Sequence, residues 1–166
     1  MTFIDMMERI LSHEGGFTLN PLDRGNYANG ILRGTKYGIS ARSYPNVDIK
    51  NLTRSQALAI YRRDFYEPLK PSIMTGATVF QLLDFAVNSG VRRANISLQK
   101  AVGAAPDGII GPVTMLAVAN TPDHKITTLI LADRLDYMSS LSAWKTFNKG
   151  WARRIATNLR YAADEL

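Results

Sequence analysis

Hydrophobic residues follow a helical spacing over the first part of the chain. Between residues 3 and 14, apolar side chains occupy positions i, i+3, i+4, i+7 and i+8, and these are Phe3, Met6, Met7, Ile10 and Leu11. Thr2, with Asp5 three residues later, is typical of a helix N-terminus. Gly15-Gly16 is typical of a helix C-terminus, because glycine readily adopts the left-handed conformation. The pattern predicts an amphipathic helix over residues 3–14.

The helical spacing is lost between residues 17 and 47. This stretch is rich in Gly, Asn, Pro and Tyr, and turn signals such as Asn29-Gly30 separate its short β-prone segments. It predicts a small irregular β region with one or two hairpins.

Helical signals return at Thr53, where Thr-Arg-Ser-Gln has the pattern of a capping box, and this helix is expected to run toward Pro68. The other expected helices cover residues 78–89, 92–102, 112–120, 123–141 and 148–163. Gly90 and Gly103 are expected to end the first two of these, and Pro112 to begin the third. No linker or repeat separates them. We therefore predict one α+β domain over residues 1–166, mainly helical with a small N-terminal β lobe. Residues 1–75 and 76–166 would form two lobes with a catalytic cleft between them.

Composition narrows the class of protein. No run of apolar residues approaches the roughly 18 that a membrane span needs, and the absence of cysteine excludes disulfides and thiolate metal ligands. The N-terminus lacks the basic start and unbroken apolar core of a secretory signal. We therefore expect synthesis in the cytoplasm, and export only with outside help.

The net charge of +6 favours a polyanionic partner, which can be nucleic acid, an anionic membrane or an acidic cell wall. The pairs Arg62-Arg63, Arg92-Arg93 and Arg153-Arg154 are expected to lie on solvated helix faces. Trp151, with Phe147 and Ile155 one turn away on either side, is expected to pack in the core.

Glu14 is the residue most informative about chemistry, because it lies in the last turn of the first predicted helix, where the chain enters the β region. The negative end of the helix dipole disfavours a second negative charge, so we expect the pKa of this carboxyl to be raised. A carboxyl that stays protonated near neutral pH can act as a general acid. The alternative is an exposed glutamate at a frayed helix end.

Asp23 follows in the turn-rich stretch and is the candidate for a second catalytic carboxylate. Glycoside hydrolysis uses two such groups, one to protonate the leaving oxygen and one to activate water or stabilise charge on the sugar. An Asp before Arg24-Gly25 is also a common turn former, whose side chain bonds local backbone amides. The pairing with Glu14 favours the catalytic interpretation.

The motifs around these residues resemble glycoside hydrolase family 108, a family of phage and prophage N-acetylmuramidases. Its signature runs EGG(Y/F), DPxDPGG and TxxGI, and the matching segments here are HEGGF at 13–17, NPLD at 20–23 and GTKYGIS at 34–40. Further segments that resemble the family are YPNVDI at 44–49, IYRRDFY at 60–66, DFAVNSG at 84–90, DGIIGPVT at 107–114 and FNKGWARR at 147–154. The resemblance covers nearly the whole chain and implies a lysozyme-like fold.

The resemblance also implies roles for individual residues. In the wider phage-lysozyme group a Glu, an Asp and a Thr form the catalytic triad, and these roles would fall to Glu14 as acid and to Asp23 and Thr35 as the residues that position water. An inverting reaction is implied. Asn88 would bind an N-acetyl group, although it is also a plausible helix C-terminal residue ahead of Gly90.

Two tyrosines, Tyr37 and Tyr44, are candidate substrate-binding residues because they lie in or just after the β lobe, where their rings can stack on sugars or be buried. The sequence departs from the family at Asp23, which is followed by Arg-Gly-Asn and not by Pro-Gly-Gly. Additional residues, among them Asn29 and Gly30, separate Asp23 from Thr35. A longer hairpin between them can change the direction in which the Asp23 or the Thr35 side chain points.

The expected function is thus that of a phage endolysin that cuts the β-1,4 bond between N-acetylmuramic acid and N-acetylglucosamine in peptidoglycan. It would act as a monomer without metal or cofactor, insert into no membrane, bind no nucleic acid, and reach the periplasmic wall through a phage pore-forming protein. The segment 107–114 resembles peptidoglycan-binding modules, but we interpret it as part of the enzyme's helical lobe.

Alternatives remain open at this stage. A lytic transglycosylase shares the single Glu but needs no water-positioning carboxylate. A non-catalytic basic wall-binding module is supported by charge alone. A zinc amidase is disfavoured, because His13 and His124 are the only histidines and the HExxH pattern is absent.

Overall fold

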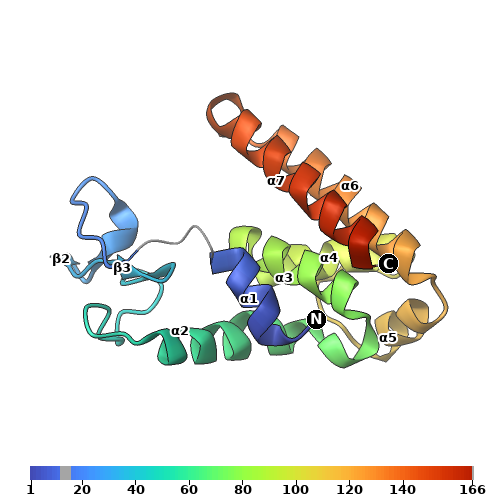
Figure 1. The fold of residues 1–166 in the computed structure, drawn as a ribbon, viewed down its shortest axis with the longest axis horizontal. Helices are drawn as coiled ribbons and strands as arrows, with labels where there is room; N and C mark the ends of the chain where they lie inside the picture. Colours follow the sequence, from blue (N-terminus) through green and yellow to red (C-terminus); the bar gives the residue numbers. More distant parts are fainter. Residues whose placement is uncertain (12–15, 166) are drawn as a thin grey trace. The chain divides into compact units, whose positions relative to one another are not determined.

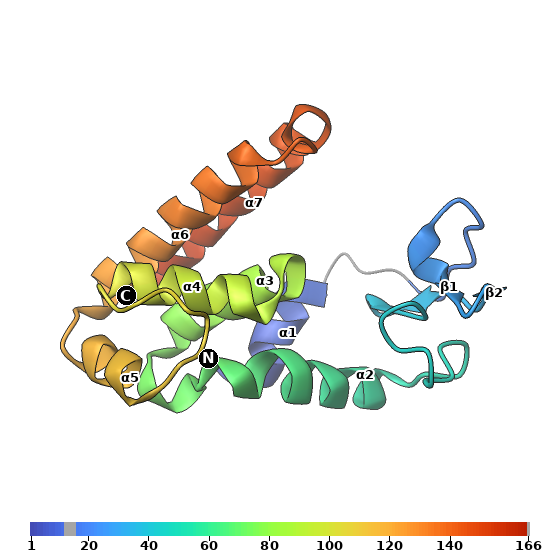
Figure 2. The same ribbon diagram turned by 180° about the vertical axis from the view of Figure 1, so that it is seen from behind.

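The computed structural model describes residues 1–11 and 16–165, which fold into two compact units. One unit comprises residues 2–63, and the other comprises Met1 and the chain from Asp64 onward. The described residues contain seven α-helices and two small antiparallel sheets (Figures 1 and 2). The predicted α+β class, mainly helical with a small β region, is confirmed.

The unit of residues 2–63 begins with α1 (Phe3–Leu11), which buries Phe3, Met6, Met7 and Ile10 as the apolar spacing predicts. The Thr2 hydroxyl accepts a hydrogen bond from the Asp5 N–H, and the Asp5 carboxylate accepts one from the Thr2 N–H. This reciprocal pair caps the helix. The predicted continuation through residues 12–15 lies outside the described residues.

The β region of the same unit consists of two hairpins. Strands β1 (Tyr27–Ala28) and β2 (Ile31–Leu32) pair across a turn in which Asn29 and Gly30 have φ of 50° and 78°. This is the type I′ turn that Asn-Gly predicts. Strands β3 (Thr35–Lys36) and β4 (Ile39–Ser40) pair across Tyr37 and Gly38, with φ of 51° and 74°. Helix α2 (Arg54–Tyr61) follows, and Thr53 with Gln56 forms the expected capping box.

The helical unit is built around α3 (Gly76–Ser89), whose residues Ala77 through Ala86 are all buried. The helices that follow it are α4 (Val91–Ala101), α5 (Pro112–Ala119), α6 (Asp123–Ser140) and α7 (Trp144–Glu165). Gly90 and Gly103 lie in the left-handed region at the predicted helix ends, and Pro112 opens α5. None of the described helices is long and apolar enough to cross a membrane.

Helices α6 and α7 lie side by side as an antiparallel hairpin (Figures 1 and 2), packed through a cluster of Leu131, Met138, Ile155 and Ala162. Trp151 is half-buried against this cluster, as predicted for a core residue. The core prediction is wrong for Phe147, which is 54% exposed and stacks on the Trp151 ring.

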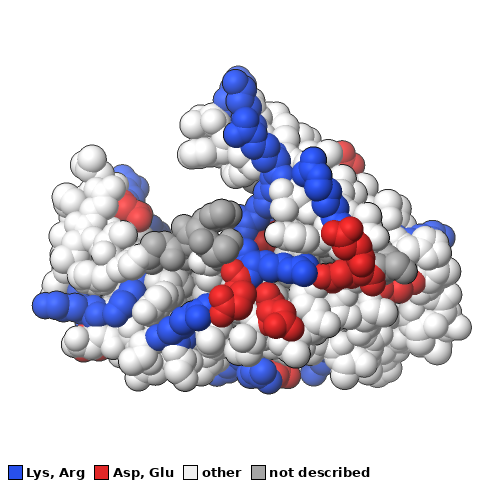
Figure 3. Space-filling view, in the orientation of Figure 1, with Lys and Arg blue, Asp and Glu red and all other residues white. Residues whose placement is uncertain are grey.

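Basic residues are concentrated on α7. Along α7, exposed basic side chains at i, i+4, i+8 and i+15 share one side of the helix, and we call them the α7 ridge: Lys145, Lys149, Arg153 and Arg160. Figure 3 shows Lys and Arg along the α6–α7 hairpin. The expectation of a solvated face holds for Arg153 but is wrong for Arg154, which pairs with the buried carboxylate of Asp84.

Candidate functional site

Glu14 lies outside the described residues, between the end of α1 at Leu11 and Gly16. Its role as general acid and its raised pKa therefore stay predictions. The other candidate residues fall in the two units, with Asp23, Thr35, Tyr37 and Tyr44 in residues 2–63 and Asn88 in the helical unit.

Asp23 is an exposed residue at the N-cap of a short 3-10 turn, η1 (Arg24–Asn26). Its Oδ1 accepts a hydrogen bond of 2.8 Å from the Gly25 N–H, which is the turn-forming interaction expected from sequence. Its Oδ2 has no hydrogen-bond partner within the described part of the chain. Asp23 therefore forms the turn and still presents one carboxylate oxygen to solvent.

Asn26, a fully buried residue, connects Asp23 to Thr35. The Asn26 N–H donates to the Asp23 carbonyl at 3.1 Å, and the Thr35 hydroxyl donates to Asn26 Oδ1 at 2.6 Å. The Asn26 side-chain amide donates in turn to the carbonyl of Asn20. Sequence reasoning missed Asn26, and the only signal was an amide residue at a position where the family carries glycine.

The residues that separate Asp23 from Thr35 form the β1–β2 hairpin. Its base is closed by the Asn26 carbonyl, which accepts hydrogen bonds from the N–H groups of Arg33 at 2.8 Å and Gly34 at 2.9 Å. The two ends of the hairpin, at Asn26 and at Arg33-Gly34, therefore lie next to each other. The additional residues do not take Asp23 and Thr35 out of a common hydrogen-bonded network.

Gly34 is required where the chain re-enters, because its φ is +90° and a Cβ there would lie 2.5 Å from the Thr18 carbonyl oxygen and 2.6 Å from the Phe17 ring. Thr18 forms an antiparallel bridge with Thr35, through hydrogen bonds of 2.9 Å and 3.0 Å. The segment around Thr18 is thus held against the strand that carries Thr35.

Tyr37 and Tyr44 are both half-buried. Tyr37 occupies the β3–β4 turn, where its carbonyl accepts a hydrogen bond of 3.0 Å from the Tyr61 hydroxyl and the Lys36 ammonium lies 5.5 Å from its ring centroid. The Tyr44 N–H donates to the Ser40 carbonyl. Neither ring is fully enclosed, so their role in stacking on sugars stays a prediction.

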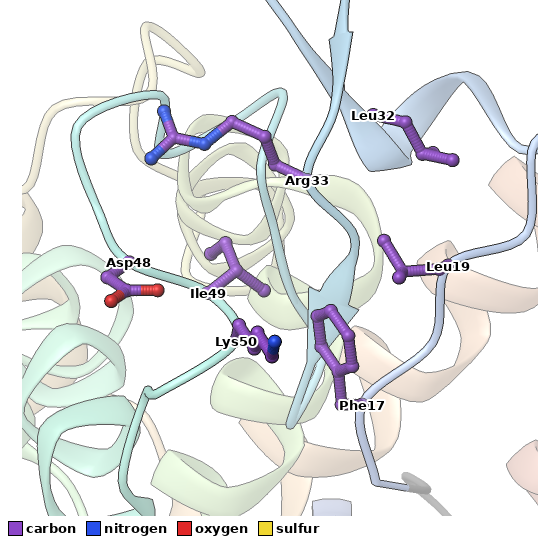
Figure 4. A pocket seen from close by; sticks show the side chains of 7 residues that line it. All are labelled: Phe17, Leu19, Leu32, Arg33, Asp48, Ile49 and Lys50. Carbon is purple, nitrogen blue, oxygen red and sulfur yellow. The ribbon is translucent and has the colours of Figure 1, made fainter.

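A pocket of about 190 Å³ lies in the same unit, and we call it the Phe17 pocket. Figure 4 shows its lining side chains around an open space, and these are Phe17, Leu19, Leu32, Arg33, Asp48, Ile49 and Lys50. Successive residues of an extended chain point to opposite faces, so Phe17 and Leu19 lie on the face opposite Thr18 and its partner Thr35. The Phe17 pocket is therefore not on the Thr35 face.

Asn88, in the helical unit, is exposed near the end of α3, where its amide donates to the Asp84 carbonyl at 2.6 Å. It thus interacts as a helix C-terminal residue would. It also lines a pocket of about 140 Å³, which we call the Arg154 pocket. The other lining residues are Ser89, Arg134, Tyr137, Met138, Leu141, Trp151 and Arg154.

Behind the Arg154 pocket, Asp84 joins α3 to α6 and α7. Its carboxylate, 3% exposed, accepts hydrogen bonds from Arg134 at 2.6 Å, Arg154 at 2.6 Å and Asn158 at 2.7 Å. Burial alone raises the pKa of Asp84, but the attraction of Arg134 and the interactions with Arg154 outweigh it and lower this pKa to about 2. Asp84 is therefore ionised throughout the neutral range.

No cluster of three His, Asp or Glu residues that could hold a metal ion occurs within residues 1–11 and 16–165. Among the described carboxylates, Asp5 caps a helix, Asp23 forms a turn and Asp84 is paired with arginines. The expected absence of a metal stays a prediction.

The family model described as glycosyl hydrolase 108 matches residues 7–90, half of the chain. The chain belongs to this family. The match includes Glu14, Asp23, Thr35 and Asn88 and ends at Gly90. The protein is therefore a glycoside hydrolase, and its family supports a lysozyme-like enzyme acting on peptidoglycan.

A solved structure similar to the chain over its whole length is that of SagA from Brucella abortus. The two share 29% sequence identity with a TM-score of 0.83, and the alignment covers 98% of this chain and 94% of SagA. The similarity therefore extends past the family match into the helices after Gly90. A comparison with curated protein sequences gave no match.

Proposed function

We propose that the protein is an N-acetylmuramidase that hydrolyses the β-1,4 bond between N-acetylmuramic acid and N-acetylglucosamine in bacterial peptidoglycan. The observation that carries this proposal is the family match over residues 7–90, which contains Glu14, Asp23 and Thr35 in order. The network through Asn26 supports the pairing of Asp23 with Thr35.

In the proposed mechanism Glu14 protonates the glycosidic oxygen, and water attacks the anomeric carbon from the other face of the sugar. The Thr35 hydroxyl already donates its hydrogen to Asn26, so its oxygen serves as an acceptor for one hydrogen of that water. Asp23 Oδ1 is held by the Gly25 N–H, which leaves Oδ2 to take the other hydrogen as general base. The outcome is inversion at the anomeric carbon.

The biological role that we propose is that of a phage endolysin made in the host cytoplasm. It would reach the periplasmic wall with the help of a phage pore-forming protein, act there as a monomer and cause lysis. Tyr37, Tyr44 and Asn88 are proposed to bind the glycan.

Glu14→Gln tests the proposal, because the amide keeps the shape of the side chain but has no proton to give to a leaving oxygen. A general acid contributes roughly a hundred- to ten-thousand-fold, so peptidoglycan hydrolysis should fall by at least a hundredfold. Glu8→Gln is the matched control, since Glu8 is an exposed residue of α1 that pairs with the exposed side chain of Arg54. Hydrolysis by this control should stay near the wild-type rate.

The products separate the proposed reaction from its closest alternative. A muramidase leaves reducing muramic acid ends, whereas a transglycosylase leaves anhydro ends. Wild-type clearance of cell walls by Glu14→Gln, or a product mixture made of anhydro ends, contradicts the proposal.

A further inference from the structure

The Arg154 pocket has a surplus of positive charge. Its lining includes Arg134 and Arg154 but no Asp or Glu, and Asp84 behind it is the one carboxylate paired with both guanidinium groups. Two cations and one anion leave a net charge of +1 at the pocket, where Arg154 remains partly in contact with solvent. Charges near the protein surface interact more strongly than charges in bulk water, so an anion in the pocket is favoured.

The accessible positive charge of the pocket belongs to Arg154. Arg134 is 1% exposed, and its Nε is fully buried without a hydrogen-bond partner within the described part of the chain, so a ligand does not reach this atom. Arg154 is only partly engaged by Asp84, because 38% of its side chain remains exposed.

The remaining lining is apolar or aromatic. The Trp151 ring packs against Trp144 and Phe147, at ring centroid distances of 6.1 Å and 5.9 Å, and Met138 and Leu141 also line the pocket. Whole small-molecule ligands fill pockets of roughly 300–1,000 Å³. At about 140 Å³ the Arg154 pocket accommodates one amino-acid-sized group of a larger ligand.

We propose that the Arg154 pocket binds a carboxylate of the stem peptide that branches from the glycan, with an aliphatic peptide side chain against Trp151 and Met138. This inference rests on the proposed function, since peptidoglycan supplies the peptide. Each N-acetylmuramic acid carries such a peptide through its lactyl group, and this peptide bears the carboxylates that the N-acetylated sugar rings lack. The α6 and α7 walls of the pocket lie beyond the family match, which ends at Gly90.

Binding is measured with a soluble muramyl tripeptide that has free carboxylates and with its fully amidated form, by tryptophan fluorescence. Wild-type protein should bind the carboxylate form at least about tenfold more tightly, as a charge-assisted hydrogen bond would produce. Arg154→Gln should remove this difference. Arg153→Gln, which removes the same charge from the neighbouring exposed position on α7, should retain it.

A second variant tests the pocket while keeping Arg154, Arg134 and Asp84. Asn88→Asp adds a negative charge to the lining and should weaken binding of the carboxylate form more than that of the amidated form. Asn120→Asp is its control, because Asn120 also donates to the carbonyl four residues earlier, at the end of α5. Equal binding of the two peptide forms by wild-type protein, or equal effects of Arg153→Gln and Arg154→Gln, overturns the proposal. The proposal is also overturned if the wild-type protein binds glycerol phosphate but does not bind the peptide.

Hydrolysis separates this inference from the proposed function. For wild-type protein, kcat/KM on peptide-bearing glycan strands should exceed that on amidase-treated strands, and Arg154→Gln should lower this ratio about tenfold. An unchanged ratio with active enzyme refutes the stem-peptide site alone. A wild-type protein that cuts neither kind of strand refutes the proposed function, while the fluorescence titration still reports on the pocket.

Discussion

Replacing Asp84 by Asn should destabilise the helical unit far more than the loss of an ordinary ion pair. The Asp84 carboxylate is 3% exposed and Arg134 is 1% exposed, so the substitution leaves a buried guanidinium without its counter-charge. Removing one partner of a buried pair costs about 3–5 kcal/mol. The amide oxygen of Asn can still accept one hydrogen bond, so we expect about 3 kcal/mol, close to the lower bound.

The assay is urea denaturation followed by circular dichroism, with Asp133→Asn as the control. Asp133 pairs with Lys100 at 2.7 Å, and their side chains are 20% and 48% exposed, so solvent screens this pair and the substitution should cost about 1 kcal/mol or less. A destabilisation by Asp84→Asn no larger than that by Asp133→Asn would refute the argument that Arg134 depends on Asp84.

The pH dependence of stability tests the same cluster. The pKa of Asp84 is lowered from 3.8 to about 2 on folding, so the unfolded chain binds this proton more readily than the native protein does. The stabilisation is therefore fully present above about pH 5 and is lost as the pH falls through about 2. A shift of that size corresponds to about 2 kcal/mol. Asp84→Asn should lack this part of the acid transition, and an identical acid transition in both proteins would exclude Asp84 as its source.

Three further predictions concern the site and its surface. Asp23→Asn should reduce turnover more than Thr35→Ala, with little change in melting temperature, and near-wild-type activity in both would mean that another carboxylate activates water. Binding to purified sacculi should weaken with added salt, since charge attraction is screened over about 8 Å at physiological ionic strength. Replacing Lys145, Lys149 and Arg160 of the α7 ridge by Gln should flatten that salt dependence, and an unchanged slope would place the wall contact elsewhere. EDTA should leave hydrolysis unchanged, and a loss of activity that zinc or calcium restores would show that a metal is required.

The fold could be predicted from the sequence wherever the signal is local. The capping box at Thr53, the Asn29-Gly30 turn and Pro112 at the start of α5 each depend on interactions within a few residues, and each prediction is confirmed. The apolar spacing of α1 likewise identified its buried face.

Predictions failed where a residue's environment depends on distant parts of the chain. Arg154 looks like one of a solvated basic pair in sequence, but its partner Asp84 lies 70 positions earlier. Phe147 has core-like spacing yet lies outside the cluster that buries Ile155. Asn26 could not be recognised as the link between Asp23 and Thr35, because its burial results from the packing of the whole β region.

Because the base of the β1–β2 hairpin is closed by hydrogen bonds, the tip of the hairpin can be replaced by another sequence. Both ends of the loop are fixed on the Asn26 carbonyl, while its tip is in solvent, with Ile31 64% exposed. A change in the length or composition of the tip therefore leaves the distance between Asp23 and Thr35 unchanged. Evolution can vary this loop among relatives without disturbing the reaction, and an engineer can graft a cell-wall-targeting peptide at Asn29-Gly30 and expect hydrolysis to continue.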